Sequence, residues 1–272
     1  MRLQSAERAT ALLITLFAVG LHGLRLVHAG PLWRDEAAAF HLATSPTLAE
    51  VVAKHESFPP PFFFLVRGWA AAFGGSDLSL RFFGLIAGLG LIAALWWSAR
   101  RTDTIPLAAL SLVAIHPAFL LYGDSLRGYG LGTVAIVAAF GAFACLNRCS
   151  IAIAAAASLA AVQILFFNAA LLLALGLAAI GVGILRRRPR LAWAAVAIGA
   201  GSALSLLPWS GSVMATRSWS GLLKVPVGPG EIFGELARTA GPLWIWLPLA
   251  ALALLPSRGD DARLFALLAL PG

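Results

Sequence analysis

The chain has 272 residues, of which 60% are hydrophobic and 12% are charged. This charged fraction is about half that of an average soluble domain, which excludes an ordinary water-soluble globular protein. The net charge is +8, but the basic residues stand in short clusters between apolar runs, as they do in cytoplasmic loops. We therefore interpret the charge as a sign of membrane topology and not of nucleic-acid binding, and we predict an all-α, polytopic integral membrane protein.

The first half of the chain predicts two spans separated by a long outer loop. Residues 10–27 are apolar, follow two arginines and lack a small-residue cleavage site, so we expect a retained first helix that runs outward. Residues 29–77 then form a first outer loop. The second helix, residues 78–99, returns to Arg100 and Arg101, which the positive-inside rule places in the cytoplasm.

The second half continues the alternation. A third helix at residues 105–121 leads out to a polar turn at 123–129, and a fourth returns to residues 147–148. The run 151–185 is too long for one ordinary span, so we divide it at 166–168. A seventh helix ends at 208–209, a second outer segment covers 210–238, an eighth helix returns to 257–263, and a ninth begins before Gly272. Residues 1–272 thus form a single bundle of eight complete spans and a partial ninth, cut short at its carboxyl end.

Smaller patterns predict local order. Thr47 with Glu50 three residues later is a capping-box pattern, and the apolar stretch 61–73 has the length of an interfacial helix. Gln163 and Asn168 lie near the predicted division, where an amide in a membrane bundle bonds between helices or contacts a ligand.

The first outer loop carries an ordered series of residue types. The series runs through Asp35-Glu36, His55-Glu56, Pro59-Pro60-Pro61, Phe62-Phe63-Phe64, Trp69, Phe73-Gly74 and Leu80-Arg81. It resembles the corresponding loop of GT-C membrane glycosyltransferases, in the family of protein O-mannosyltransferases and lipid A aminoarabinose transferase. The resemblance implies a GT-C helical bundle with juxtamembrane helices in this loop. It also implies transfer of a sugar from a dolichyl- or polyprenyl-phosphate donor to a lipid, glycan or protein acceptor, on the extracytoplasmic face of the cell membrane.

Sugar transfer of this kind needs a carboxylate to deprotonate or orient the acceptor and basic groups to stabilise the leaving phosphate. The resemblance places the catalytic role on Asp35, with Glu36 as its neighbour or helper. The alternative is that both acids only favour the first turn of a surface helix.

Five further residues are candidates for substrate binding. His55 contacts phosphate or metal, or is a solvated loop histidine, and Arg81 either clamps a phosphate or snorkels to the interface. A branch of the resembling family has an acid, an arginine and a tyrosine in the second outer turn, which Asp124, Arg127 and Tyr129 match. We expect Arg127 on the phosphate and the other two near sugar or acceptor; the alternative is a surface pair between Asp124 and Arg127.

We expect no obligatory metal, although a divalent cation is possible, because the few acids do not make a convincing oxygen cage. Cys145 and Cys149 predict neither a disulfide framework nor a metal site. The resembling enzymes have a second Asp where this chain has residues 127–131, so their donor chemistry does not transfer. Two alternatives stay open: a multi-span transporter, and a non-catalytic membrane subunit of a cell-envelope polymer pathway.

Overall fold

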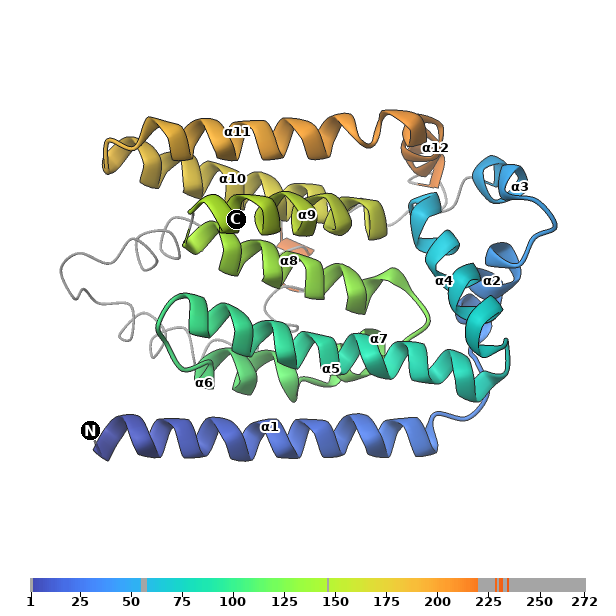
Figure 1. Ribbon diagram of the computed structural model, residues 1–272. Coiled ribbons are helices and arrows are strands. Elements are labelled where there is room, and N and C mark those ends of the chain that lie inside the picture. Colours follow the sequence, from blue (N-terminus) through green and yellow to red (C-terminus); the bar gives the residue numbers. More distant parts are fainter. Residues whose placement is uncertain are drawn as a thin grey trace.

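The computed structural model describes residues 2–54, 58–145 and 147–219, together with residues 228, 230, 231 and 234 (Figure 1). Every regular element in these ranges is helical, and they contain no strand. The predicted all-α class is therefore confirmed for the described part of the chain. The predicted eighth and ninth spans and most of the second outer segment lie outside it.

Four helical stretches are long and apolar enough to cross a membrane. They are Ser5–His28 within α1 (Arg2–His28), α5 (Asp77–Arg101), α10 (Asn168–Leu185), and Pro189–Ala215, which includes α11 (Pro189–Leu204) and the first part of α12 (Ser210–Trp219). A fifth span results if α7 (Pro117–Gly123) and α8 (Gly128–Ala144), bent by 112°, count as one. The chain is thus a multi-pass membrane protein. These four or five spans are fewer than the seven predicted for this region, partly because α9 (Arg148–Ile164) is shorter.

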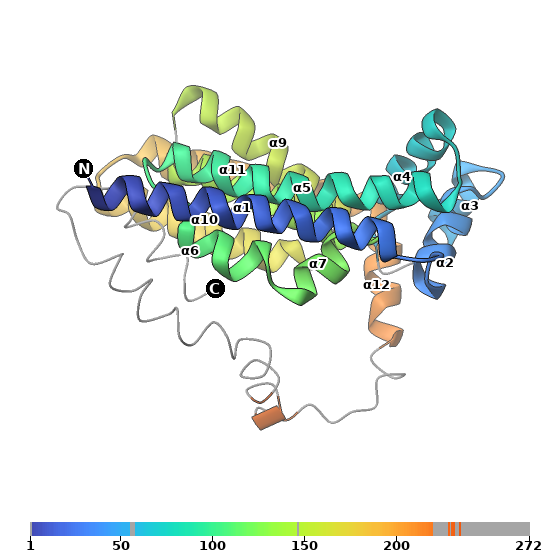
Figure 2. The same ribbon diagram turned by 90° about the horizontal axis from the view of Figure 1, so that it is seen from below.

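The long helices lie side by side, and the two ends of the bundle differ. At one end gather α2 (Arg34–Ala43), α3 (Leu48–Ala53) and α4 (Pro60–Phe73), as both ribbon views show (Figures 1 and 2). We call this the loop end. The opposite end, which we call the basic end, holds the start of α1, the last turn of α5 and the turn between α10 and α11 (Figure 1). Arginines 100, 101 and 186–188 lie there, which is the clustering that the positive-inside rule predicts for one side of a membrane.

The predicted third helix, residues 105–121, is not continuous. It consists of α6 (Leu107–Ala109), a π-helical turn (Leu110–Ala114) and α7, with a break at His116. Pro117 has no N–H to donate and its ring restricts the residue before it, so His116 takes an extended conformation with φ −72° and ψ 130°. This break leaves a short helix, α7, that carries the second outer turn.

The division between α9 and α10 falls where the length of the apolar run predicted it, and the amides beside it join helices. Gln163 Nε2 donates to the backbone oxygen of Ser205 at 2.9 Å, and its Oε1 accepts from Trp209 Nε1 at 2.8 Å. Asn168 Nδ2 donates to the backbone oxygen of Gly132 on α8 at 3.1 Å. The predicted bonding between helices is confirmed for both side chains.

The first outer loop folds against the bundle through both apolar and polar contacts. Phe62 and Phe63 on α4 are buried. Arg67 donates to the backbone oxygen of Ser45 at 2.6 Å, and Trp69 Nε1 donates to the backbone oxygen of Ser79, in α5, at 3.1 Å. The loop therefore presents its side chains from ordered helices.

Candidate functional site

Two adjacent acids begin α2, and their side chains meet different surroundings. Trp33 is the N-cap of the helix, and its backbone N–H donates to Glu36 Oε2 at 3.1 Å. This capping contact turns the Glu36 side chain inward, where the residue is 1% exposed. The side chain of Asp35 is 36% exposed. Two consecutive residues thus carry one buried carboxylate and one that is open to solvent.

Glu36 and Arg81 form a buried ion pair that joins three segments. Arg81 Nη1 donates to the Glu36 carboxylate at 2.9 Å, and its Nη2 donates to the backbone oxygen of Pro31 at 2.7 Å. The backbone N–H of Leu126 donates to the same carboxylate at 2.8 Å. The start of the first outer loop, α5 and the second outer turn therefore meet at one carboxylate. Because both charges are committed to each other, this geometry favours a positioning role for the pair, and direct contact of either group with substrate stays a prediction.

Arg127 lies against Asp35. Its Nη1 donates to the backbone oxygen of Asp35 at 3.1 Å, and its guanidinium stacks over the Phe58 ring at 4.5 Å. The Arg127 Nε is buried and has no hydrogen-bond partner within the described structure. The Asp35 carboxylate accepts a hydrogen bond from Arg34 Nε at 3.3 Å and from no other described side chain, and the Arg34 side chain is 93% exposed. Such a solvated contact contributes little, so the Asp35 carboxylate remains available.

Asp124 pairs with a histidine that the sequence reasoning missed. His22 Nδ1, on α1, lies 2.7 and 2.8 Å from the two carboxylate oxygens of Asp124, and both side chains are buried. The alternative of a surface pair between Asp124 and Arg127 is wrong, because Arg127 reaches Asp35 instead. The expected contact of Asp124 with sugar or acceptor stays a prediction, and its present partner ties α1 to the end of α7.

Small residues on α5 make room for this pair. A Cβ on Gly84 would overlap the backbone oxygen of Asp124, and a Cβ on Gly88 would overlap the Asp124 carboxylate and come within 2.7 Å of the His22 ring. The spacing Gly-x-x-x-Gly is the one that lets helices approach closely in membranes. Together with a histidine inside an apolar helix, this spacing is the sequence signal that could have indicated the pair.

Tyr129 lines a surface cavity of about 490 Å³ at the loop end. The cavity is lined by Trp33, Ala118, Phe119, Tyr122, Gly123, Tyr129 and Thr133. The Tyr129 ring packs on Phe58 at 5.2 Å, and the Arg127 guanidinium lies over the same Phe58 ring, so Phe58 connects this cavity-lining tyrosine to the arginine. Aromatic rings with polar tips suit ligands that have both apolar and hydroxylated parts.

The structure thus connects most of the predicted site residues. Hydrogen bonds link Asp35, Glu36, Arg81 and Arg127 through the start of α2 and the turn after α7, and Tyr129 adjoins them through Phe58. His55 lies outside the described residues. No three His, Cys, Asp or Glu side chains converge in the described ranges, and metal dependence stays a prediction.

No protein-family model matches the chain, and neither a curated protein nor a solved structure matches it. The resemblance carried by the first outer loop therefore remains a prediction.

Proposed function

We propose that the protein is a membrane glycosyltransferase of the GT-C type that moves a sugar from a polyprenyl-phosphate donor to a lipid, glycan or protein acceptor. The observation that carries the proposal is the contrast between two adjacent acids. Glu36 is buried and accepts three hydrogen bonds, while Asp35 keeps a solvent-accessible carboxylate and its backbone oxygen accepts from Arg127. An accessible carboxylate, on a residue whose backbone binds an arginine, supplies the two kinds of group that acid–base sugar transfer needs.

The clustering of arginines supports the sidedness of the proposal. If the basic end faces the cytoplasm, as the positive-inside rule predicts, then the loop end faces the extracytoplasmic side of the cell membrane. Asp35, Arg127 and the aromatic cavity would all meet substrate there. A lipid-linked donor would reach them from the outer leaflet.

In the proposed reaction, the acceptor hydroxyl attacks the anomeric carbon of the donor sugar. A new bond forms between that carbon and the acceptor oxygen, and the bond to the phosphate oxygen breaks. The hydroxyl proton passes to the Asp35 carboxylate, which contributes on the order of 10² to 10⁴ in rate for a positioned base. Polyprenyl phosphate leaves with a new negative charge, which the Arg127 guanidinium stabilises. The rings of Trp33, Tyr122 and Tyr129 would contact the sugar or the first part of the isoprenoid.

A transporter is the second candidate, and a specific observation favours it. His22 and Asp124 form a buried pair between α1 and the break before α8, and ionisable groups inside membrane bundles often mark substrate paths. Transport would depend on this pair and not on Asp35. Substitutions at the two places therefore separate the candidates.

The test is transfer of label from a panel of radiolabelled polyprenyl-phosphate sugars in membranes that contain the protein. We expect one donor to be used by the wild type and not by Asp35→Asn. Asp77→Asn is the matched control, because Asp77 is an exposed acid in the first turn of α5 at the same end. Label transfer that survives Asp35→Asn would contradict the proposed catalytic role of Asp35. Loss of solute uptake into vesicles in His22→Ala would favour the transporter.

A further inference from the structure

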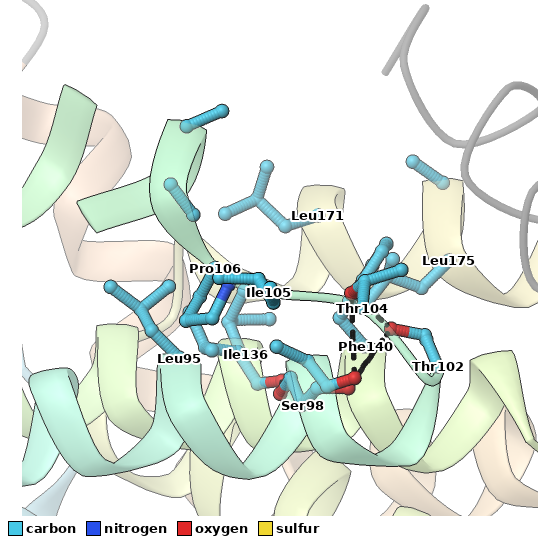
Figure 3. A pocket seen from close by; sticks show the side chains of 15 residues that line it. Leu95, Ser98, Thr102, Thr104, Ile105, Pro106, Ile136, Phe140, Leu171 and Leu175 are labelled. Atoms are coloured by element: carbon cyan, nitrogen blue, oxygen red, sulfur yellow. Dashed lines mark hydrogen bonds between the residues drawn. The ribbon is translucent and has the colours of Figure 1, made fainter. Parts of the chain in front are cut away.

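Besides the cavity that Tyr129 lines, the described part of the chain has a large apolar cavity and a small charged one. The large cavity, of about 430 Å³, lies between α5, α6, α8 and α10, and its wall is mostly apolar (Figure 3). Its hydroxyl groups, on Ser98, Thr102 and Thr104, already bond within the protein. These hydroxyls therefore give no indication of a ligand. The small cavity differs because the polar groups in its wall have hydrogen-bonding capacity left.

The small cavity lies at the loop end, where the end of α1 meets α5 and the turn after α7. Its lining residues are Arg25, Leu26, Ala29, Arg81, Leu85 and Asp124. Its volume is about 10 Å³, which is close to the smallest volume that holds one water molecule. A sugar, a lipid or a nucleotide does not fit a space of this size, so only a water molecule or a small ion can occupy it.

Three of the lining side chains can make further hydrogen bonds. The Nε atoms of Arg25 and Arg81 are buried and have no partner within the described structure, although other nitrogens of both guanidinium groups donate to backbone oxygens. The Asp124 carboxylate contacts one nitrogen of His22, and its two oxygens offer about four acceptor sites. Arg81 is 8% exposed and Asp124 is 5% exposed. Because a buried N–H without a partner is costly, these Nε atoms favour a bound acceptor.

The charges around the cavity distinguish a water molecule from an ion. The two guanidinium groups disfavour a cation, and the Asp124 carboxylate disfavours an anion. A water molecule suits both kinds of neighbour, because its oxygen accepts hydrogen bonds and its hydrogens are donated. Buried waters typically make about three hydrogen bonds, which is the number that two Nε–H groups and one carboxylate provide.

We propose that one water molecule binds in this cavity and links the two buried ion pairs of the loop end. Its oxygen accepts from the two Nε–H groups, and it donates one hydrogen bond to the Asp124 carboxylate. The Glu36–Arg81 pair and the His22–Asp124 pair then form one hydrogen-bonded network from α1 to the start of α2. Asp35 precedes Glu36 in that helix, so the network fixes the docking of α1 and the position of Asp35 together. The site does not depend on the proposed sugar transfer.

The direct experiment is a structure of the full chain at a resolution that shows ordered waters, for the wild type, Ala29→Val and Ala38→Val. In the wild type we expect one density peak within about 2.5–3.2 Å of an Asp124 carboxylate oxygen and of an arginine Nε. Ala29→Val adds two methyl groups to the wall and should remove the peak. Ala38→Val is the matched control and should keep it, because Ala38 is exposed on α2 and does not line the cavity.

The wild-type map alone can overturn the proposal. A cavity without a peak, in a map that shows waters elsewhere, would do so. So would a peak that takes up bromide when bromide replaces chloride in the buffer, because the site would then hold an anion.

A double-mutant cycle tests the link between the two pairs. If the pairs act independently, the increases in the unfolding equilibrium constant for His22→Ala and Glu36→Gln multiply in the double variant. We expect the double variant to fall short of this product by at least about fivefold. The shortfall should shrink to about twofold or less in the Ala29→Val background and persist in Ala38→Val. A shortfall that Ala29→Val leaves unchanged would assign the coupling to the backbone of residues 124–126 and overturn the link.

Discussion

The two ends of the bundle place their charges in opposite ways. At the loop end, ionisable side chains from distant segments are buried and paired, as in Glu36 with Arg81 and His22 with Asp124. At the basic end, Arg100 is exposed, and the hydroxyls of Ser98 and Thr104 donate to backbone oxygens. Burying charges costs free energy unless they are paired with good geometry. Such pairs therefore fix the relative positions of the helices more than they stabilise the bundle. The buried pairs therefore fix the positions of side chains at the loop end, whereas the exposed arginines at the basic end orient the bundle in the membrane.

The largest expected effect is on the buried ion pair. Glu36→Ala leaves the Arg81 guanidinium without its carboxylate and Leu126 without its acceptor. We expect a loss of about 3–5 kcal/mol in the free energy of unfolding, which is typical of removing one partner of a buried pair. Unfolding in detergent, followed by circular dichroism against denaturant, measures it.

A double substitution sharpens this test. Glu36→Ala with Arg81→Met removes both charges, so part of the lost stability should return. If the single substitution leaves stability unchanged, the loop end is not held by the pair.

The next effect concerns α1. His22→Ala leaves the Asp124 carboxylate buried without the partner that lies 2.7 Å away, and we expect a loss of about 3 kcal/mol. His28→Ala is the matched control on the same helix, because His28 is exposed and bonds only within α1. Its unfolding free energy should change by less than about 0.5 kcal/mol. Equal effects of the two substitutions would refute the pair's role in docking α1.

A smaller effect is expected at Gly84 and Gly88, which form a notch on α5 that receives Asp124. Gly88→Ala would push against the Asp124 carboxylate and the His22 ring, at a cost of about 1–3 kcal/mol for overpacking. Gly90→Ala is the control two residues away, where the new Cβ meets Val134 at a tolerable 3.5 Å, and it should be neutral or stabilise the helix by up to about 1 kcal/mol. The same unfolding assay compares them. Tolerance of Gly88→Ala would show that the notch is not close-packed.

The smallest effect is at a surface cap. The backbone N–H of Glu50 donates to Thr47 Oγ1 at 3.2 Å at the start of α3, so Thr47→Ala should cost about 1 kcal/mol locally. Amide hydrogen exchange within α3 should accelerate about fivefold, with α5 unchanged. Faster exchange that extends into α5 would indicate that the loop and the bundle unfold together.

Local patterns in the sequence predicted local structure well. The Thr47 cap, the short helix α4 and the division before Asn168 all depend on residues within a few positions of one another, and each is confirmed. The break at His116 was missed although Pro117 marked it, because the apolar run around it reads as one span. Hydropathy shows how long an apolar segment is, but it does not show that Pro117 lacks the N–H needed to continue a helix.

The contacts of the site were harder to predict because they join distant parts of the chain. His22 and Asp124 are 102 residues apart, and a single histidine in an apolar run gives no sign of its partner. Asp35 and Glu36 look equivalent in the sequence. Only the fold shows that the cap at Trp33 turns one carboxylate inward to Arg81 and leaves the other outside.

The most direct test compares Asp35→Asn with Glu36→Gln in the same preparation, measuring both sugar transfer and the thermal unfolding midpoint. We predict that Asp35→Asn lowers transfer by at least about a hundredfold and leaves the unfolding midpoint unchanged, whereas Glu36→Gln lowers the midpoint. Wild-type transfer by Asp35→Asn, with the protein folded, would contradict the division of roles between the two acids.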